Sequence, residues 1–424
     1  MKIIMQNEIT LFDGQFDVDA IFRQKIYEEM DAGQDEALYL CNLSDVARKY
    51  DLWCQKLPRV KPFYAVKCNS DENVVRLLAK LGTGFDCASR TEINAVLKYG
   101  VTPDRIIFAN PCKANSHIRY AAATNTSLMT FDSASELEKI RLLYPDAHLV
   151  LRFRCDAKKA EVLMGSKFGC DPHIDGPQLL LKAKNLGLIV VGISFHVGSG
   201  CEDPPIYRKA IKHARKLFDY ATTLGFCMTL LDIGGGFPGD IGSDLGPFAD
   251  IVNAALDDYF PEGEDNIEII SEPGKYFVAS AFTLGVTIHS KNEVLGPDGN
   301  VTHMKYYAND GVYGSFIGVL VNLPITEPHA LLKNTSEDIE KCQPSVKSTL
   351  WGPTCDGFDK IFEDQVLPQL DIGDVLVFPN MGAYTMSLST TFNGFQSAQV
   401  MYFLEVQDAK DLGINLCSPV NIAG

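Results

Sequence analysis

Reactive side chains recur at one kind of place in this sequence, directly after short apolar runs that resemble buried strands. Residues chosen only for packing would not produce such a series, so the positions indicate an enzyme. In a closed α/β barrel, catalytic residues lie at the carboxyl ends of the strands. The residues at these expected strand ends are Lys67, Asp86, Asn110 with Lys113, Asp132, Arg152, His196, Gly234–Gly236 and Glu272–Gly274.

Lys67 and the glycine run have the most specific chemistry. A lysine that is desolvated at a barrel mouth can offer its free amine for imine formation, although an isolated lysine is more often a surface residue. The three consecutive glycines in Asp232–Gly239 (DIGGGFPG) expose backbone N–H groups to which a phosphate can bind. They follow the seventh run, and the usual phosphate site of this barrel lies after strands seven and eight.

His196, Arg152 and Glu272 each allow more than one interpretation. His196 could be a core residue or could stack on an aromatic ligand. Glu272 could pair with a neighbour or hold a proton on a heterocyclic nitrogen, and Arg152 could pair with either residue or with a ligand group. An amine, a phosphate cradle and a carboxylate on one mouth are the groups that pyridoxal phosphate requires.

The first two thirds of the chain alternate apolar runs with helix-compatible stretches. Asp71 and Ser133 are expected N-caps, and Gly82, Gly100 and Gly225 stand where helices should end. Eight such units predict a closed (β/α)8 barrel of the TIM type. The expected strands are Pro62–Val66, Gly84–Ala88, Ile106–Ala109, Leu128–Phe131, Leu149–Phe153, Val190–Phe195, Thr229–Ile233 and Ile267–Ile270. The expected helices are Asp71–Leu81, Arg90–Lys98, Ser133–Leu143, Pro177–Asn185, Tyr207–Thr223 and Phe248–Phe260.

After about residue 272 the pattern becomes mostly β. The strand-like segments Lys2–Met5 and Glu8–Phe12 predict that the N-terminus joins this later domain. We therefore expect an N-terminal segment over residues 1–34, a barrel over residues 35–272 and a β domain over residues 273–424. The strands expected in the β domain are Phe277–His289, His303–Asn309, Ile317–Val321, Asp374–Phe378 and Ala398–Glu405.

Composition excludes several classes of protein. The 424 residues are 46% hydrophobic and 22% charged, which is typical of a globular chain with two domains. With 38 Lys+Arg and 54 Asp+Glu the net charge is −16, which disfavours nucleic-acid binding. No apolar run approaches the roughly 18 residues of a membrane span, and no secretory signal is evident, so we expect a cytoplasmic protein. The twelve cysteines form no Cys-x-x-Cys pair, so we expect neither a metal site nor a disulfide scaffold.

A second group of unusual residues lies in the β half, within Trp351–Gly357 (WGPTCDG), Gly382–Thr385 (GAYT) and Phe392–Phe395 (FNGF). Cys355 and Asp356 stand in a loop framed by glycine and proline. Such a loop either presents side chains to a ligand or forms a tight turn with a buried thiol.

Nine motifs in order carry a resemblance to a known family: PFYAVKCN, GTGFDCAS, ANPCK, SFHVGSG, DIGGGFPG, SEPGKYFVAS, NDGVYGSF, WGPTCDG and MGAYT. Together they resemble the eukaryotic ornithine decarboxylases, which belong to the barrel-fold pyridoxal-phosphate decarboxylases of basic amino acids. The resemblance runs from about residue 35 to residue 405. It implies an α/β fold in which the (β/α)8 barrel is followed by a C-terminal β-barrel domain of the alanine racemase type.

The resemblance also implies a role for each matching residue. Lys67 would form the Schiff base, His196 would stack on the cofactor ring and Glu272 would bind its pyridinium nitrogen. Cys355 would be the fourth catalytic residue and would protonate Cα. The cofactor would also be held by Asp86, Arg152, Ser199, Gly235, Gly236, Gly274, Lys275 and Tyr384, and the substrate by Asp356, Asn322 and Phe392.

The activity implied is decarboxylation of L-ornithine to putrescine and CO2, the first step of polyamine biosynthesis. Cys355 and Asp356 would come from the second subunit of a homodimer with shared active sites, and an antizyme-type regulator is an expected partner. Two positions depart from the family pattern. Lys275 replaces an arginine at the phosphate, and Asn322 replaces an aspartate at the distal amine of the substrate. Decarboxylation of arginine or lysine, and a non-catalytic homologue resembling antizyme inhibitor, therefore stay as alternatives.

Overall fold

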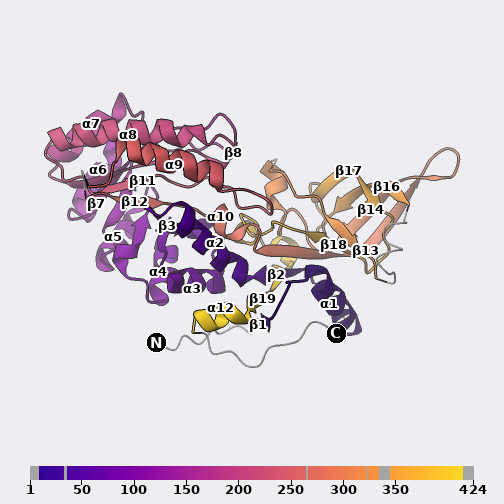
Figure 1. Ribbon diagram of the computed structural model, residues 1–424. Coiled ribbons are helices and arrows are strands. Elements are labelled where there is room, and N and C mark those ends of the chain that lie inside the picture. Colours follow the sequence, from indigo (N-terminus) through magenta and orange to yellow (C-terminus); the bar gives the residue numbers. More distant parts are fainter. Residues whose placement is uncertain (1–8, 33–35, 264–265, 322, 334–343, 414–424) are drawn as a thin grey trace. The chain divides into compact units, whose positions relative to one another are not determined.

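The computed structural model describes residues 9–32, 36–263, 266–321, 323–333 and 344–413 (Figure 1). The chain divides into two compact units. The barrel unit is Val46–Phe277, and the β unit combines Met1–Asp45 with Val278–Gly424. Within the described part of the chain, no helix is both long enough and apolar enough to cross a membrane.

Eight parallel strands close into a barrel, as the sequence predicts (Figure 1). Their ends differ from the expected ones by at most two residues, and pairing of the last strand with the first closes the ring. In chain order the strands are β3 (Val60–Ala65), β4 (Gly84–Cys87), β5 (Ile106–Phe108), β6 (Leu128–Phe131), β7 (His148–Arg154), β9 (Ile189–His196), β11 (Leu230–Asp232) and β12 (Glu268–Ser271).

Helices connect the barrel strands, and their ends have the expected caps. The Asp71 carboxylate accepts the N–H groups of Asn73 and Val74, and the Ser133 hydroxyl accepts that of Glu136. Gly82 ends its helix with a φ of 100°, a left-handed conformation that glycine adopts without strain. The helices are α2 (Leu43–Lys56), α3 (Glu72–Leu81), α4 (Arg90–Lys98), α5 (Asn115–Ala123), α6 (Ala134–Leu143), α7 (Asp175–Asn185), α8 (Pro205–Thr223), α9 (Gly246–Tyr259) and the short α10 (Lys275–Val278).

Apolar side chains from different strands fill the barrel interior. Phe63, Ile107, Val150 and Ile270, from four of the strands, belong to one buried cluster. A Cβ at Gly84 would lie 2.5 Å from the Phe63 ring, so a glycine is needed beside that ring. The interior is therefore packed like a core, and side chains at the carboxyl ends of the strands remain to form the site.

Two short strands outside the ring lie near its mouth, and the sequence did not predict them. Strand β8 (Ala160–Val162) pairs antiparallel with β10 (Ser199–Cys201). The Cys201 N–H donates to the Gly236 carbonyl at 3.0 Å, so this small sheet contacts the glycine run.

The β unit contains a mixed nine-stranded sheet in which β1, β19, β2, β13, β14, β16 and β17 are successive neighbours. Strands β15 and β18 pair with each other, and β18 also pairs with β13. The bounds are β1 (Ile9–Phe12), β2 (Leu38–Asn42), β13 (Phe282–Leu295), β14 (Val301–Ala308), β15 (His329–Leu331), β16 (Ser345–Trp351), β17 (Lys360–Pro368), β18 (Val375–Phe378) and β19 (Gln399–Glu405). This unit also includes the helices α1 (Val18–Ala32) and α12 (Val406–Asp411).

The sequence prediction was wrong at two places in this half. Ile317–Val321 forms the 3₁₀ helix η3 instead of a strand, with a local bond from the Val319 N–H to the Phe316 carbonyl. The strand expected from residue 277 begins at Phe282, because the short helix α10 occupies residues 275–278. The expected strand Lys2–Met5 lies outside the described residues.

Candidate active site

Lys67 lies at the barrel mouth in the 3₁₀ turn η1 (Val66–Cys68) that follows β3. Its ammonium group forms an ion pair with the carboxylate of Asp86, which is buried at β4. The Lys67 side chain stays one-third exposed, whereas the carboxylate has no exposed surface. The two residues therefore give a reachable amine whose position is fixed by a buried counter-charge.

Three carboxyl groups are buried close together at the ends of β4, β11 and β12. Asp232 accepts the Ser194 hydroxyl at 2.7 Å and the Gly234 N–H at 2.9 Å. By contrast, Oε1 of Glu272 and Oδ1 of Asp86 have no hydrogen-bond partner in the described part of the chain. Burial, together with the charges of Asp232 and Asp86, raises the pKa of Glu272 well above its ordinary value.

His196 ends β9, and its imidazole accepts the Gly198 N–H on Nδ1 at 3.0 Å. That bond requires Nδ1 to be unprotonated, so the neutral ring carries its proton on Nε2. Burial lowers the pKa of His196 well below its ordinary value, and the charges of Arg152 and Lys67 lower it further. The ring is therefore a neutral, flat group at the mouth.

The glycine run forms a close contact between β9, β11 and β12. A Cβ at Gly235 would lie 2.5 Å from the Glu272 carbonyl oxygen and 3.1 Å from Nε2 of His196. Gly236 has a φ of 109°, which side chains rarely tolerate. Within the described part of the chain, the N–H groups of both glycines donate to no protein acceptor. Two such groups side by side can bind an anion.

Arg152 and Gly274 complete the mouth. Arg152, on β7, is buried, and its guanidinium lies 5.5 Å from the centroid of the Phe168 ring and 3.9 Å from Sδ of Met164. Both contacts come from residues 157–168, which contain β8. A Cβ at Gly274 would meet Cβ of Cys68 at 2.8 Å, so this glycine lets the chain pass close to the turn that carries Lys67.

Lys275 follows Gly274 and is already paired with two carboxylates. Its Nζ lies 2.6 Å from Oε1 of Glu161 and 3.0 Å from Oδ2 of Asp240. Ser199, the remaining cofactor residue predicted in this unit, is buried in β10. The structure thus places ten of the predicted residues on one side of the barrel: Lys67, Asp86, Arg152, His196, Ser199, Gly235, Gly236, Glu272, Gly274 and Lys275.

A second cluster lies in the β unit, around Cys355 and Asp356. The Tyr313 hydroxyl donates to the Asp356 carboxylate, and the centroids of the Tyr313 and Phe392 rings are 4.6 Å apart. The hydrogen bond from Tyr313 lowers the pKa of Asp356, which favours a charged carboxylate. Tyr313 lies within the motif NDGVYGSF, and nothing in that local pattern pairs it with a residue 43 positions later.

The loop that carries Cys355 is held from below by a buried carboxylate. Asp359 accepts the N–H groups of Val312 and Thr354, and also the Thr354 hydroxyl at 2.6 Å. Cys355 itself is exposed, which contradicts the alternative of a turn with a buried thiol. The loop therefore presents its thiol outward from a rigid base.

Two predicted residues of the β unit remain. Tyr384 has a φ of 56°, a left-handed conformation that costs a residue other than glycine about 1–3 kcal/mol and is frequent at functional sites. Asn322 lies outside the described residues.

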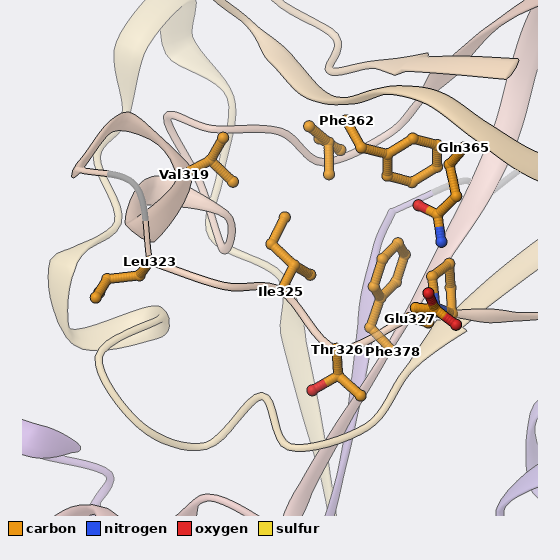
Figure 2. Close-up of a pocket in the computed structure, with 10 residues that line it drawn as sticks. Val319, Leu323, Ile325, Thr326, Glu327, Phe362, Gln365 and Phe378 are labelled. Atoms are coloured by element: carbon orange, nitrogen blue, oxygen red, sulfur yellow. The ribbon is translucent and has the colours of Figure 1, made fainter. Parts of the chain in front are cut away.

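A cavity of about 460 Å³ lies in the β unit, between η3, β17 and β18. Figure 2 shows the side chains that line it. None of the predicted site residues that the structure describes lines it, and seven of the ten described lining residues have apolar side chains. The lining residues are Val319, Leu323, Ile325, Thr326, Glu327, Pro328, Ile361, Phe362, Gln365 and Phe378.

Comparisons with known proteins agree with this geometry. Residues 43–279 match the model of the pyridoxal-dependent decarboxylase family, pyridoxal binding domain. The chain is 44% identical to ornithine decarboxylase 2 of Drosophila melanogaster, over 93% of this chain and 98% of the relative. It is 47% identical to antizyme inhibitor 2 of Xenopus laevis, over 94% of this chain and 88% of the relative.

A solved structure has the same architecture. The arginine decarboxylase of Paramecium bursaria Chlorella virus superposes with a TM-score of 0.84 at 37% identity, over 91% of this chain and all of that one. The expected fold, a barrel followed by a β domain of the alanine racemase type, is confirmed. The chain belongs to the eukaryotic ornithine decarboxylase family of pyridoxal-dependent decarboxylases.

Proposed function

We propose that this protein binds pyridoxal phosphate at the barrel mouth and decarboxylates L-ornithine to putrescine and CO2 in the cytoplasm. The observation that carries the proposal is Oε1 of Glu272, which is buried and has no hydrogen-bond partner among the residues that the structure describes. A buried carboxyl oxygen is costly to leave unpaired, and a protonated ring nitrogen would satisfy it. The N–H groups of Gly235 and Gly236, which donate to no acceptor in the described residues, fit the phosphate of the same cofactor.

Each residue of the mouth then has one task. Lys67 would hold the cofactor covalently through its amine, with Asp86 fixing the position of that amine. His196 would lie flat against the ring, and Arg152 would add positive charge beside it. When bound, the pyridine ring supplies an electron sink for the bond that breaks at Cα.

The cluster in the β unit supplies groups that the mouth lacks. The Asp356 carboxylate, oriented by Tyr313, would bind the distal ammonium of ornithine, and the Cys355 thiol would give a proton to Cα. Exposed aromatic residues lie beside these groups. The Phe358 N–H donates to the Asp356 carboxylate and its side chain is 75% exposed, while Phe392 packs on Tyr313 and is 43% exposed. An exposed apolar patch of this kind is typical of a protein interface. We infer that a second copy of the chain covers it in a homodimer with shared active sites.

The relatives also support two alternatives. Asn322 leaves open a preference for arginine or lysine, and the solved arginine decarboxylase has the same fold. A non-catalytic role, as the name of antizyme inhibitor 2 suggests for that relative, would rest on binding an antizyme-type partner. The intact set of Lys67, Asp86, Glu272 and Cys355 favours the enzyme.

The deciding experiment measures CO2 release from ornithine, lysine and arginine, with and without added pyridoxal phosphate. Release that depends on the cofactor and comes mainly from ornithine is expected. A preference for arginine or lysine would correct the substrate. If the protein binds pyridoxal phosphate but releases no CO2 from any of the three amino acids, the proposed enzyme activity would be wrong. The partner-binding alternative would then be favoured.

A further inference from the structure

Lys275 directly follows Gly274, one of the predicted cofactor residues, and its charge is already shared. Glu161 and Asp240 both contact its ammonium group, and the Lys275 side chain is only 16% exposed. Hydrogen bonds and ion pairs to these two carboxylates raise the pKa of Lys275, although burial opposes them. One ammonium between two carboxylates leaves the group of three with a net negative charge.

Glu161 is linked to the glycine run through the small sheet of β8 and β10. It belongs to β8, which pairs with β10 next to the glycine run. A Cβ at Gly200 would lie 2.3 Å from the carboxyl carbon of Glu161, so this carboxyl group packs on the bare Gly200 backbone. The neighbouring Cys201 N–H donates to the Gly236 carbonyl at 3.0 Å. The Glu161 carboxylate therefore contacts both the Lys275 ammonium group and the Gly200 backbone. The residue after Gly200 in turn contacts Gly236.

This arrangement opposes the binding of a third anion at Lys275. A phosphate monoester carries about 1.5 to 2 negative charges at neutral pH. A lysine ammonium has three N–H donors, and Glu161 and Asp240 each lie within hydrogen-bond distance of it. A phosphate that approaches Lys275 must therefore either accept the repulsion or displace a carboxylate.

We propose that Glu161 competes with the phosphate of the cofactor for Lys275 and so sets the affinity of the protein for pyridoxal phosphate. The Glu161 carboxylate occupies the anion position at Lys275, and binding of the phosphate releases it together with β8. This inference rests on the proposed function, because it takes pyridoxal phosphate as the ligand. Residues 157–168 also contact Arg152, so release of β8 would loosen one side of the mouth.

The test compares the dissociation constants of pyridoxal phosphate and pyridoxal, which lacks the phosphate, by absorbance titration. Glu161→Gln keeps the size of the side chain and removes its charge. It should lower the dissociation constant of pyridoxal phosphate roughly threefold to tenfold and leave that of pyridoxal unchanged. Asp240→Asn should act in the same direction. Glu202→Gln, a control on an exposed residue just after β10, should change neither constant.

Unchanged or weaker binding of pyridoxal phosphate by Glu161→Gln would overturn the inference, because the ion pair would then only orient Lys275. An equal gain for pyridoxal would overturn it too, since the effect would not involve the phosphate. If the unmodified protein bound no pyridoxal phosphate, the proposed function would fail. Inorganic phosphate would then decide the inference, since it should raise the Tm of Glu161→Gln more than that of the unmodified protein.

Discussion

The barrel mouth and the Cys355 cluster of the β unit differ in the solvent exposure of their reactive groups. At the mouth, Asp86, Asp232 and Glu272 are buried, and burial shifts the pKa of Glu272 strongly. In the β unit, Cys355 is exposed and Asp356 lies beside exposed aromatic side chains. The first group is desolvated within one chain, whereas the second is exposed and would be covered only in the proposed dimer.

This difference indicates that the two units have different roles in the proposed reaction. A desolvated site can bind and polarise a cofactor without help, because its electrostatic interactions are already strong. An exposed thiol and carboxylate gain such strength only when another surface excludes water from them. The barrel unit should therefore control cofactor binding, and the β unit should control the use of substrate in the assembled protein.

Removing the amine group of Lys67 should have the largest effect on activity. Lys67→Ala should lower CO2 release about ten-thousandfold or more, because the covalent attachment of the cofactor is lost. Turnover numbers measured with saturating ornithine and pyridoxal phosphate check this. Lys61→Ala is the matched control, since Lys61 is a β3 lysine whose side chain is 70% exposed and pairs with the surface residue Glu268. Near-normal turnover by Lys67→Ala would contradict the role of Lys67.

Mixing two inactive variants tests whether the halves of a site come from different chains. In a shared site, Lys67→Ala and Cys355→Ala spoil opposite halves, so a mixed dimer has one intact site of its two. Random exchange at equal amounts should then restore about a quarter of the normal activity, since half of the dimers are mixed. Activity of the mixture against its ratio measures this. No recovery after demonstrated subunit exchange would place both residues in one chain's own site.

Glu272→Gln separates stability from cofactor binding at the mouth. Folding raises the pKa of Glu272 above its ordinary value of about 4.5, so the carboxylate costs the folded state more as the pH rises through and above that value. The variant removes this cost. Its cofactor-free form should therefore gain about 2–4 °C in Tm at pH 8, and less at pH 5. Its affinity for pyridoxal phosphate should fall.

Thermal unfolding at both pH values and a cofactor titration measure these effects. A stability gain of the same size at pH 5 and pH 8 would rule out the burial of charge as its cause. A variant that binds the cofactor as tightly as the unmodified protein would show that Glu272 does not meet the ring nitrogen.

The sequence predicted the mouth better than the β unit, for a physical reason. Barrel strands are short apolar runs, and the fold itself brings their carboxyl ends together, so Lys67, Asp86 and Glu272 could be grouped without a structure. The rule still overstates function at Lys113. That residue is fully buried, pairs with Glu136 at 2.9 Å and donates to two backbone carbonyls, so its charge is used within the fold.

The β unit is held by contacts between distant segments, which a local pattern does not reveal. Tyr313 meets Asp356 only after the chain has passed through two strands, and Asp359 supports a loop that the sequence alone leaves undefined. Likewise, Ile317–Val321 is apolar and β-branched enough to predict a strand, yet its backbone closes local turns. Glu161 could not be predicted from the sequence, because its contact with Lys275 joins residues 114 positions apart and β8 lies beside β10 only in the folded chain.

Tyr313→Phe should have the smallest effect and tests the single hydrogen bond between Tyr313 and Asp356 in the β unit. The variant keeps the ring packed on Phe392 but removes the hydrogen bond to Asp356. Because that bond orients the carboxylate without touching the cofactor, the KM for ornithine should rise about twofold to tenfold while kcat changes little. Leu142→Ala, in an exposed residue of the barrel unit, is a control that should change neither constant. A fall in kcat at unchanged KM would instead place Tyr313 in the chemical step.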